Sequence, residues 1–588
     1  MKKQLLFIPA LCLGLLTGCG NTKEEADMII FANQIYTANK NAQFADAIAI
    51  KNGKYIYVGD IEGASKYKGN RTAIYSTEFV MPSGIEGHAH FLLEQAFMKK
   101  CYIKPLNSVG DIKTKAEILA EIEDYALRNA ILLDNQPHLF GYGYNQLYLS
   151  EYSRSDLDSL AGGIYAEVPI YIAETSLHEA WVNTITLTRA GVALKLESGA
   201  KDPVVGIQRD SNGFATGVLT NEAVGYILQK GFQYPICNDV EYRNVVKNTC
   251  EYLNSMGYTG HYDAWTNFDG TEGIYKALHN VDVSKELTCL FTSTYNITTF
   301  EYGDGTKLDD ILNKVNRIRS DYKSERFDPK YIKLFADGVL ETGTGYMKEP
   351  YIGVYSDYGT GEQIWSQEDM NRIVLESNKK DLLVHTHTLG DASCTEAVKS
   401  FVNSNNVLGK KTRNSLGHCI LIDDPDIALI KENEIGLAMN AGWLAECDES
   451  FDLYENIIGP ERGAKLYPYD KLIPLGIKPA ISTDRPCSDG PIDIFDYMAS
   501  IILGYDANEG NRTPRREMNV TVENAIDMLT INGAWMGNYE DTRGSIEVGK
   551  YADFVTSEYS PFYCNPRLIK DIEIQSTCFE GKFVYFKK

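Results

Sequence analysis

Histidine is scarce in this chain, with nine residues among 588, and four of the nine form two His-x-His pairs. The first pair is His88 and His90, and the second is His385 and His387. Side chains two positions apart in an extended segment point to the same side, so each pair can present two imidazole nitrogens to one ion. A single pair is a weak signal, because two histidines also fall two apart by chance. The pairs indicate a metal site only if other ligands accompany them.

Two further candidates stand at the ends of short apolar runs. His418 ends Leu416-Gly417-His418, and Asp484 ends Ile481-Ser482-Thr483-Asp484. Taken singly, a histidine at a strand end can bond a backbone carbonyl, and an aspartate after a strand often caps a helix. The joint occurrence of imidazoles and a carboxylate favours a divalent metal site, with zinc as the expected ion and one or two ions bound.

Such a site predicts hydrolytic chemistry. A bound divalent metal lowers the pKa of water from about 15.7 toward about 7, which makes a nucleophile available at neutral pH. Asp484 is then suited to accept the proton of the attacking water and to deliver it to the leaving amine. The pattern therefore predicts a metal-dependent hydrolase in which Asp484 is both the catalytic residue and a ligand.

A lysine interrupts one of the apolar runs. Lys333 stands inside Tyr331-Ile332-Lys333-Leu334-Phe335. A lysine buried in a sheet must lower its pKa, find a counter-charge or be modified. One suitable modification is carboxylation of the amine by carbon dioxide, which gives a carbamate that can bridge two cations. The alternative to a modification is an ion pair between Lys333 and Asp337 or another acid. The residues alone leave both interpretations open.

The middle of the chain alternates short β-rich runs with amphipathic helical stretches, which is typical of βα units and a parallel sheet. Eight such runs predict an α/β fold, a (β/α)8 TIM-type barrel over residues 81–540, with its site at the C-terminal strand ends. The gap after the first strand is too long for one helix and predicts an insertion at about 139–240. The predicted strands are Phe79 to Gly84, Gly257 to Tyr262, Leu287 to Thr292, Tyr331 to Phe335, Leu382 to His385, Ser415 to His418, Ile435 to Met439 and Lys478 to Ser482.

Both ends of the chain are rich in short strand-like runs. Asn52-Gly53 separates two of them near the start, which is a strong hairpin signal. Near the other end, Glu580-Gly581-Lys582 marks a turn before the last run. We therefore expect residues 27–80 and 541–588 to form one small β-sandwich domain together.

The first 19 residues have the pattern of a bacterial lipoprotein signal. Two lysines precede a short apolar stretch, and Leu16-Thr17-Gly18-Cys19 supplies small residues before a cysteine. The pattern predicts lipidation of Cys19, residues 20–26 as a tether, and anchoring in the bacterial cell envelope at the periplasmic face or the cell surface. An ordinary cleaved signal peptide is the alternative.

The charge of the chain excludes one class of partner. Lys and Arg number 57 and Asp and Glu number 80, which gives a formal charge of −23. Because a surface with this much negative charge repels a phosphate backbone, we expect no nucleic-acid partner. A small-molecule substrate is expected, and the sequence leaves the oligomeric state, including a homo-oligomer, undetermined.

In combination, these motifs resemble the amidohydrolase superfamily, in particular amidohydrolase family 3, the branch that includes N-substituted formamide deformylases. The resemblance extends from about Asp27 to the C-terminus. It rests on motifs that surround the candidate ligands and on one motif in the insertion. They are Met81 to His90, Ala173 to Asn183, Lys333 to Glu341, His387 to Asp391, Gly417-His418, Ser482 to Pro486, Thr530 to Ala534 and Gly544 to Asp553.

The resemblance implies a role for each candidate residue. His88 and His90 would bind one metal together with Asp484, and Lys333 would be the bridging carbamate. His387 and His418 would hold a second metal, which leaves His385 behind the ligands or in the core. His178, in the insertion, is the candidate substrate contact, with a structural role as the alternative.

The implied activity is hydrolysis of a non-peptide C–N bond in an amide, an N-substituted formamide or a cyclic amide. Two other classes remain open at this point. One is a metal-dependent esterase, lactonase or deaminase on the same barrel, and the other is an inactive surface lipoprotein that binds small ligands.

Overall fold

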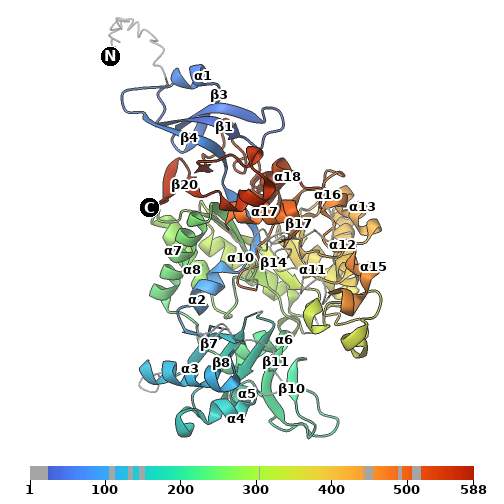
Figure 1. Ribbon diagram of the computed structural model, residues 1–588. Helices are drawn as coiled ribbons and strands as arrows, with labels where there is room; N and C mark the ends of the chain where they lie inside the picture. Colours follow the sequence, from blue (N-terminus) through green and yellow to red (C-terminus); the bar gives the residue numbers. More distant parts are fainter. Residues whose placement is uncertain are drawn as a thin grey trace, which may run out of the picture.

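The computed structural model describes residues 24–588 except 105–112, 130–136, 145–151, 176, 304, 441–442, 444–453, 488–492 and 506–517. Three sheets lie along one axis, with a barrel in the middle, a sheet built from the two chain ends on one side, and the sheet of the insertion on the other (Figure 1). Within the described residues, no helix combines the length and apolar character needed to cross a membrane. The signal segment and Cys19 lie outside the described residues.

The central sheet confirms the predicted α/β barrel. Its eight strands are all parallel and follow the order β18-β17-β16-β15-β14-β13-β12-β5. The two end strands, β5 and β18, also contact each other, so the sheet is nearly closed. The strands are β5 (Gly84–Ala89), β12 (Tyr258–Asp263), β13 (Leu290–Asn296), β14 (Phe327–Phe335), β15 (Leu383–Thr388), β16 (Ser415–His418), β17 (Gly436–Met439) and β18 (Pro479–Ile481).

Helices cover the outside of the barrel because their apolar faces match the outward side chains of the strands. Several begin with side-chain caps, as in α7, where the Asn238 side chain accepts hydrogen bonds from the backbone of Val240 and Glu241. The covering helices are α2 (Phe91–Phe97), α7 (Asp239–Ser255), α8 (Gly273–Val283), α10 (Leu308–Tyr322), α11 (Gln367–Lys379), α12 (Asp391–Leu408), α13 (Asp424–Asn433), α17 (Ile494–Leu503) and α18 (Val522–Leu529), whereas Met536 of α19 (Ile531–Met536) packs against the inward side chains at the bottom of the barrel.

The first barrel strand differs from the prediction. Residues Phe79 to Pro82 belong to β4 of the terminal sheet, and the barrel strand is β5, which begins at Gly84. Both segments are apolar and β-rich, so composition could not separate two consecutive strands that enter different sheets. As a consequence His88 lies inside a barrel strand, and His90 directly follows it.

The two chain ends meet in one sheet of seven strands, ordered β21-β20-β19-β4-β1-β2-β3. Its hydrogen bonds are continuous, so the expected two-sheet sandwich is here a single sheet with apolar clusters of side chains on both faces. At the predicted hairpin, Asn52 and Gly53 have φ of 50° and 79°, as the turn requires. The strands are β1 (Met28–Tyr36), β2 (Phe44–Lys51), β3 (Lys54–Gly59), β4 (Ala73–Pro82), β19 (Phe554–Ser557), β20 (Ile574–Phe579) and β21 (Lys582–Phe586).

The insertion begins earlier than predicted, at β6 rather than near residue 139. Its sheet has the order β10-β11-β9-β8-β7-β6. The helix α3 (Lys115–Arg128) belongs to the insertion as well, because its buried face of Ile118, Ile122 and Ala126 packs with side chains of the insertion strands. The insertion strands are β6 (Cys101–Tyr102), β7 (Leu139–Tyr144), β8 (Ile170–Glu174), β9 (Glu179–Val182), β10 (Ile207–Arg209) and β11 (Ala215–Thr220), and α6 (Glu222–Ile227) follows.

Candidate metal centre

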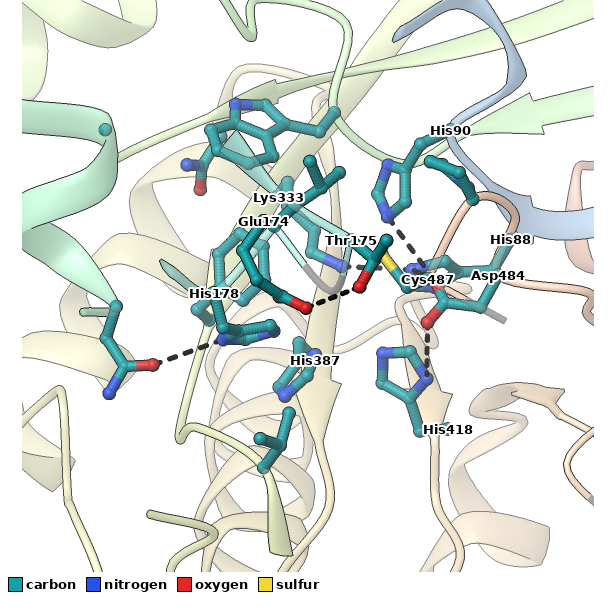
Figure 2. A pocket seen from close by; sticks show the side chains of 18 of the residues that line it. His88, His90, Glu174, Thr175, His178, Lys333, His387, His418, Asp484 and Cys487 are labelled. Carbon is teal, nitrogen blue, oxygen red and sulfur yellow. Dashed lines mark hydrogen bonds and ion pairs between the residues drawn. The ribbon is translucent and has the colours of Figure 1, made fainter. Parts of the chain in front are cut away.

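The predicted ligands come together at the C-terminal ends of the barrel strands (Figure 2). The inward positions of a strand recur every second residue, so Tyr331 and Lys333 of β14 both point into the barrel. Tyr331 packs with Tyr262 and Met536 below the site. The gathered residues are His88 in β5, His90 after it, Lys333 in β14, His387 in β15, His418 in β16 and Asp484 after β18.

Asp484 lies at the centre of this group. Its Oδ1 is 3.4 Å from His88 Nε2 and 3.4 Å from His90 Nε2, and its Oδ2 is 4.0 Å from His418 Nδ1. The side chains of His88, His418 and Asp484 offer three ligand atoms within 4.8 Å of one another. Oδ1 is buried and has no hydrogen-bond partner among the described residues. A buried, unpartnered carboxylate oxygen that faces two imidazoles fits a cation.

Three of the gathered imidazoles are in the protonation state that metal binding needs. Burial lowers the pKa of His88, His387 and His418 well below the usual value, and the nearby Lys333 lowers each of them further. They are therefore neutral at physiological pH, and each keeps a lone pair on one ring nitrogen. Only a neutral imidazole can bind a metal.

Lys333 is fully buried, and its Nζ lies 3.3 Å from His88 Nε2. Burial lowers its pKa to about 7, although the negative charge of Asp484 acts in the opposite direction. A substantial share of the amine is therefore neutral and nucleophilic near neutral pH. Asp337, the partner considered for an ion pair, is occupied elsewhere.

Asp337 holds the end of β15 in place. Its carboxylate accepts hydrogen bonds from the backbone amides of Tyr346, Leu389 and Gly390 and from the Ser393 hydroxyl. Its Oδ1 is also 3.6 Å from Nε2 of His387. The carboxylate thus fixes the loop that follows His387, and burial raises the pKa of Asp337 to about 7.

A second buried carboxylate closes the seam of the barrel between β5 and β18. Glu86 Oε1 accepts hydrogen bonds from the backbone amides of His88 and Thr483, each at 3.0 Å. The Ser482 hydroxyl and the Asp484 amide both donate to the His88 carbonyl, at 2.7 and 3.0 Å. These bonds replace a regular strand ladder, and they place His88 and Asp484 side by side.

The insertion covers the mouth of the barrel and encloses a cavity of about 540 Å³ above the ligands. Its contributions include Tyr142, Glu174, His178 and Glu222. The His178 ring lies 5.7 Å from that of His387, and its Nδ1 is 3.2 Å from Asn221 Oδ1. A cavity of this size suits a small molecule.

Comparison with known proteins identifies the family. The model of the amidohydrolase family matches residues 78–585, which is most of the chain. The chain belongs to the amidohydrolase family. It is therefore a metal-dependent hydrolase of carbon–nitrogen bonds, as the resemblance implied.

Its relatives are distant but similar in length. The putative amidohydrolase YtcJ of Bacillus subtilis is 24% identical, over 94% of this chain and 98% of its own. An N-substituted formamide deformylase of Arthrobacter pascens is 22% identical, over 95% of this chain and 98% of its own. The crystal structure of an uncharacterised metal-dependent hydrolase from Pyrococcus horikoshii has the same fold, with a TM-score of 0.68, 18% identity, and coverage of 92% of this chain and 99% of that chain.

The sequence missed two side chains of this amidohydrolase site. Cys487 offers a sulfur within 4.8 Å of ligand atoms of His90 and Asp484, and it also lines the cavity. The Trp443 ring stacks on that of His418, with centroids 5.1 Å apart. Cys487 could have been noticed because it follows Asp484 by three residues, whereas nothing in the sequence around Trp443 indicates this contact.

Proposed function

We propose that this amidohydrolase cleaves the C–N bond of a small non-peptide amide, with N-substituted formamides and cyclic amides as the first classes to test. The observation that carries the proposal is the buried Asp484 carboxylate, which faces His88 and His90 with no hydrogen-bond partner for Oδ1 among the described residues. The similarity to an N-substituted formamide deformylase supports the substrate class.

The division of the proposed metal ligands between two ions follows the resemblance to the amidohydrolase family, and the distances around Asp484 support the first of the two sets. Nε2 of His88, Nε2 of His90 and Asp484 would hold the first ion, and His387 and His418 a second. Imidazole and carboxylate donors of this kind favour zinc. The Lys333 amine, 3.3 Å from His88 Nε2, would take up carbon dioxide with loss of one proton, and the resulting carbamate would be a ligand shared by the two ions.

The side chains around the cavity carry out the remaining steps of the proposed reaction. When bound, zinc acidifies water and polarises the substrate carbonyl. Asp484 accepts the proton of the attacking water at its carboxylate and passes it to the nitrogen of the leaving amine. His178 orients the substrate from the roof of the cavity, with its ring held by Asn221. The insertion limits access of bulk water to these groups.

The test is a substrate panel with the metal-loaded protein. Formamides, cyclic amides, an ester, a lactone and an aminopurine are compared by the release of amine, alcohol or ammonia. We expect amine release, with loss of activity after chelation and after His88→Ala. The matched control is His279→Ala, because His279 lies in α8 and bonds the Tyr322 carbonyl away from the cavity. Full turnover by the metal-free protein would contradict the proposal. Preferred release of alcohol would instead indicate an esterase or lactonase, and preferred release of ammonia would indicate a deaminase.

We also propose that the mature protein is anchored through lipidated Cys19. Only a few residues would separate the lipid from the described chain, which enters the terminal sheet on the side of the barrel opposite the insertion (Figure 1). The cavity would then face away from the membrane. Labelling of cells with an alkyne fatty acid should mark the wild type and leave Cys19→Ser unmarked. An unmarked wild type would favour the ordinary signal peptide.

A further inference from the structure

His385 is the histidine of the second pair to which the family resemblance gives no ligand role, and the structure does not place it beside His387 on one ion. It is fully buried inside the barrel. Its Nε2 lies 2.6 Å from His88 Nδ1, and its Nδ1 lies 2.7 Å from the Ser415 hydroxyl oxygen. Both ring nitrogens are therefore occupied within the protein. His385 thus touches a proposed ligand from behind and does not itself face the metal.

The contacts fix where the protons must be. His88 turns Nε2 toward the site, because this atom is 3.4 Å from Asp484 Oδ1 and 3.3 Å from Lys333 Nζ. A lone pair on that nitrogen requires the ring proton on Nδ1, which then donates to Nε2 of His385. His385 can accept only if its own proton is on Nδ1, where it donates to Ser415.

Two of the other proposed ligand rings, those of His387 and His418, have oxygen acceptors in this place, whereas Nδ1 of His90 has no hydrogen-bond partner among the described residues. His387 Nε2 lies 3.0 Å from the carbonyl of Gly338, and His418 Nδ1 lies 2.9 Å from Asn440 Oδ1. An outer hydrogen bond of this kind sets the orientation and tautomer of a ligand imidazole. For His88, the acceptor is another imidazole.

We propose that His385 is a positioning residue that fixes the tautomer and orientation of His88 for metal binding, an inference that rests on the proposed function. The register of the barrel creates the contact, since Lys333 pairs with His385 and His385 pairs with Ser415 across three neighbouring strands. An apolar residue at 385 would leave the His88 Nδ1–H buried without an acceptor, and the ring could then reverse its tautomer.

The experiment compares zinc affinity, by chelator competition, among variants of the full chain. His385→Met removes the acceptor at similar volume, and His385→Gln keeps one. We expect His385→Met to weaken zinc binding by about 10- to 100-fold and His385→Gln by no more than about 3-fold. The matched control is Thr386→Val on the same strand, because Thr386 is equally buried and is the neighbour on the opposite face.

Two further measurements and one further variant distinguish a folding defect from the proposed effect. Thermal unfolding of each metal-free variant reports whether the fold is intact. The variant Ser415→Ala leaves the His385 ring in place and should weaken zinc binding only about 3-fold. The absorption spectrum of the cobalt-loaded protein should change in His385→Met and not in Thr386→Val. Unchanged zinc affinity in His385→Met, or equal losses in His385→Met and His385→Gln, would overturn the inference. A wild type that binds no zinc would instead overturn the proposed function.

Discussion

The barrel mouth and the contact between the barrel and the terminal sheet both bury charge, but they do so in opposite ways. At the contact, Arg543 pairs with Asp553 and Glu580, and Arg326 pairs with Glu580 at 2.6 Å and with Asp282 at 2.8 Å. We call these five residues the arginine network. Each charge in the network faces an opposite charge, whereas Oδ1 of Asp484 at the mouth has no hydrogen-bond partner among the described residues.

The comparison separates charged side chains that are buried in ion pairs from a charged side chain that is buried for ligand binding. Removal of one member of a buried ion pair leaves an uncompensated charge and is strongly destabilising, so substitutions in the arginine network should lower the stability of the joint between the sheet and the barrel. An unpartnered carboxylate costs free energy until a cation arrives. The mouth therefore gives up stability for ligand binding, and substitutions in the two regions should have opposite consequences.

The largest effect is expected for Asp484→Asn. Loss of the proton acceptor and of one metal ligand should lower kcat by about 10³-fold or more. The metal-free variant should be at least as stable as the wild type, because the variant no longer buries a carboxylate that costs free energy without a cation. Steady-state kinetics and thermal unfolding of the metal-free protein check both parts, and a variant with more than a tenth of wild-type kcat would contradict the role of Asp484.

Arg543→Met should lower the stability of the protein and leave its kcat nearly unchanged. It leaves Asp553 and Glu580 buried beside an apolar side chain, at a cost of about 3–5 kcal/mol in the free energy of unfolding. The kcat of the folded protein should stay within about twofold of wild type. Denaturant unfolding measures the loss, with Arg189→Met as the control because Arg189 is exposed at the end of α5 (Thr184–Arg189). Equal stability of the two variants would mean that the network is not structural.

Metal removal tests the mouth as a whole. Zinc at 100 times its dissociation constant should stabilise the folded protein by about 2.7 kcal/mol, and a chelator should reverse the gain. The gain should persist in Arg543→Met and disappear in His88→Ala. Thermal unfolding with and without zinc gives the answer, and a gain that survives in His88→Ala would place the ion elsewhere.

The smallest effect concerns a carboxylate outside the cavity lining, of which one oxygen, Oε2, has no hydrogen-bond partner among the described residues. Glu179 is buried in β9, and burial, together with the charge of Glu174, raises its pKa from 4.5 to about 8. Between these values the unfolded chain loses the proton while the folded chain keeps it, so stability falls as pH rises through this window. Glu179→Gln should therefore match the wild type in free energy of unfolding at pH 4.5 and be more stable than the wild type at pH 8.5. Unfolding curves at the two pH values test this, and a constant difference would refute the assignment.

Much of the barrel could be predicted because its strands are local apolar runs. β16 has the predicted limits Ser415–His418, and the other seven strands lie close to their predicted runs except for the first. The first strand was misplaced because β4 has the periodicity of a barrel strand, and the insertion begins at β6, earlier than predicted. Local periodicity reports how a segment is buried but not against which neighbour.

The same division applies to the site. The types and spacing of His88, His90, His418 and Asp484 were enough to predict the residues that converge, because side-chain direction alternates in a strand and parallel strands end at one rim. Other contacts depend on the register across strands and on the path of distant loops. They are the hydrogen bonds from His88 through His385 to Ser415, the position of the Cys487 sulfur, and the arginine network. Those contacts join residues far apart in the chain, so only the tertiary structure decided them.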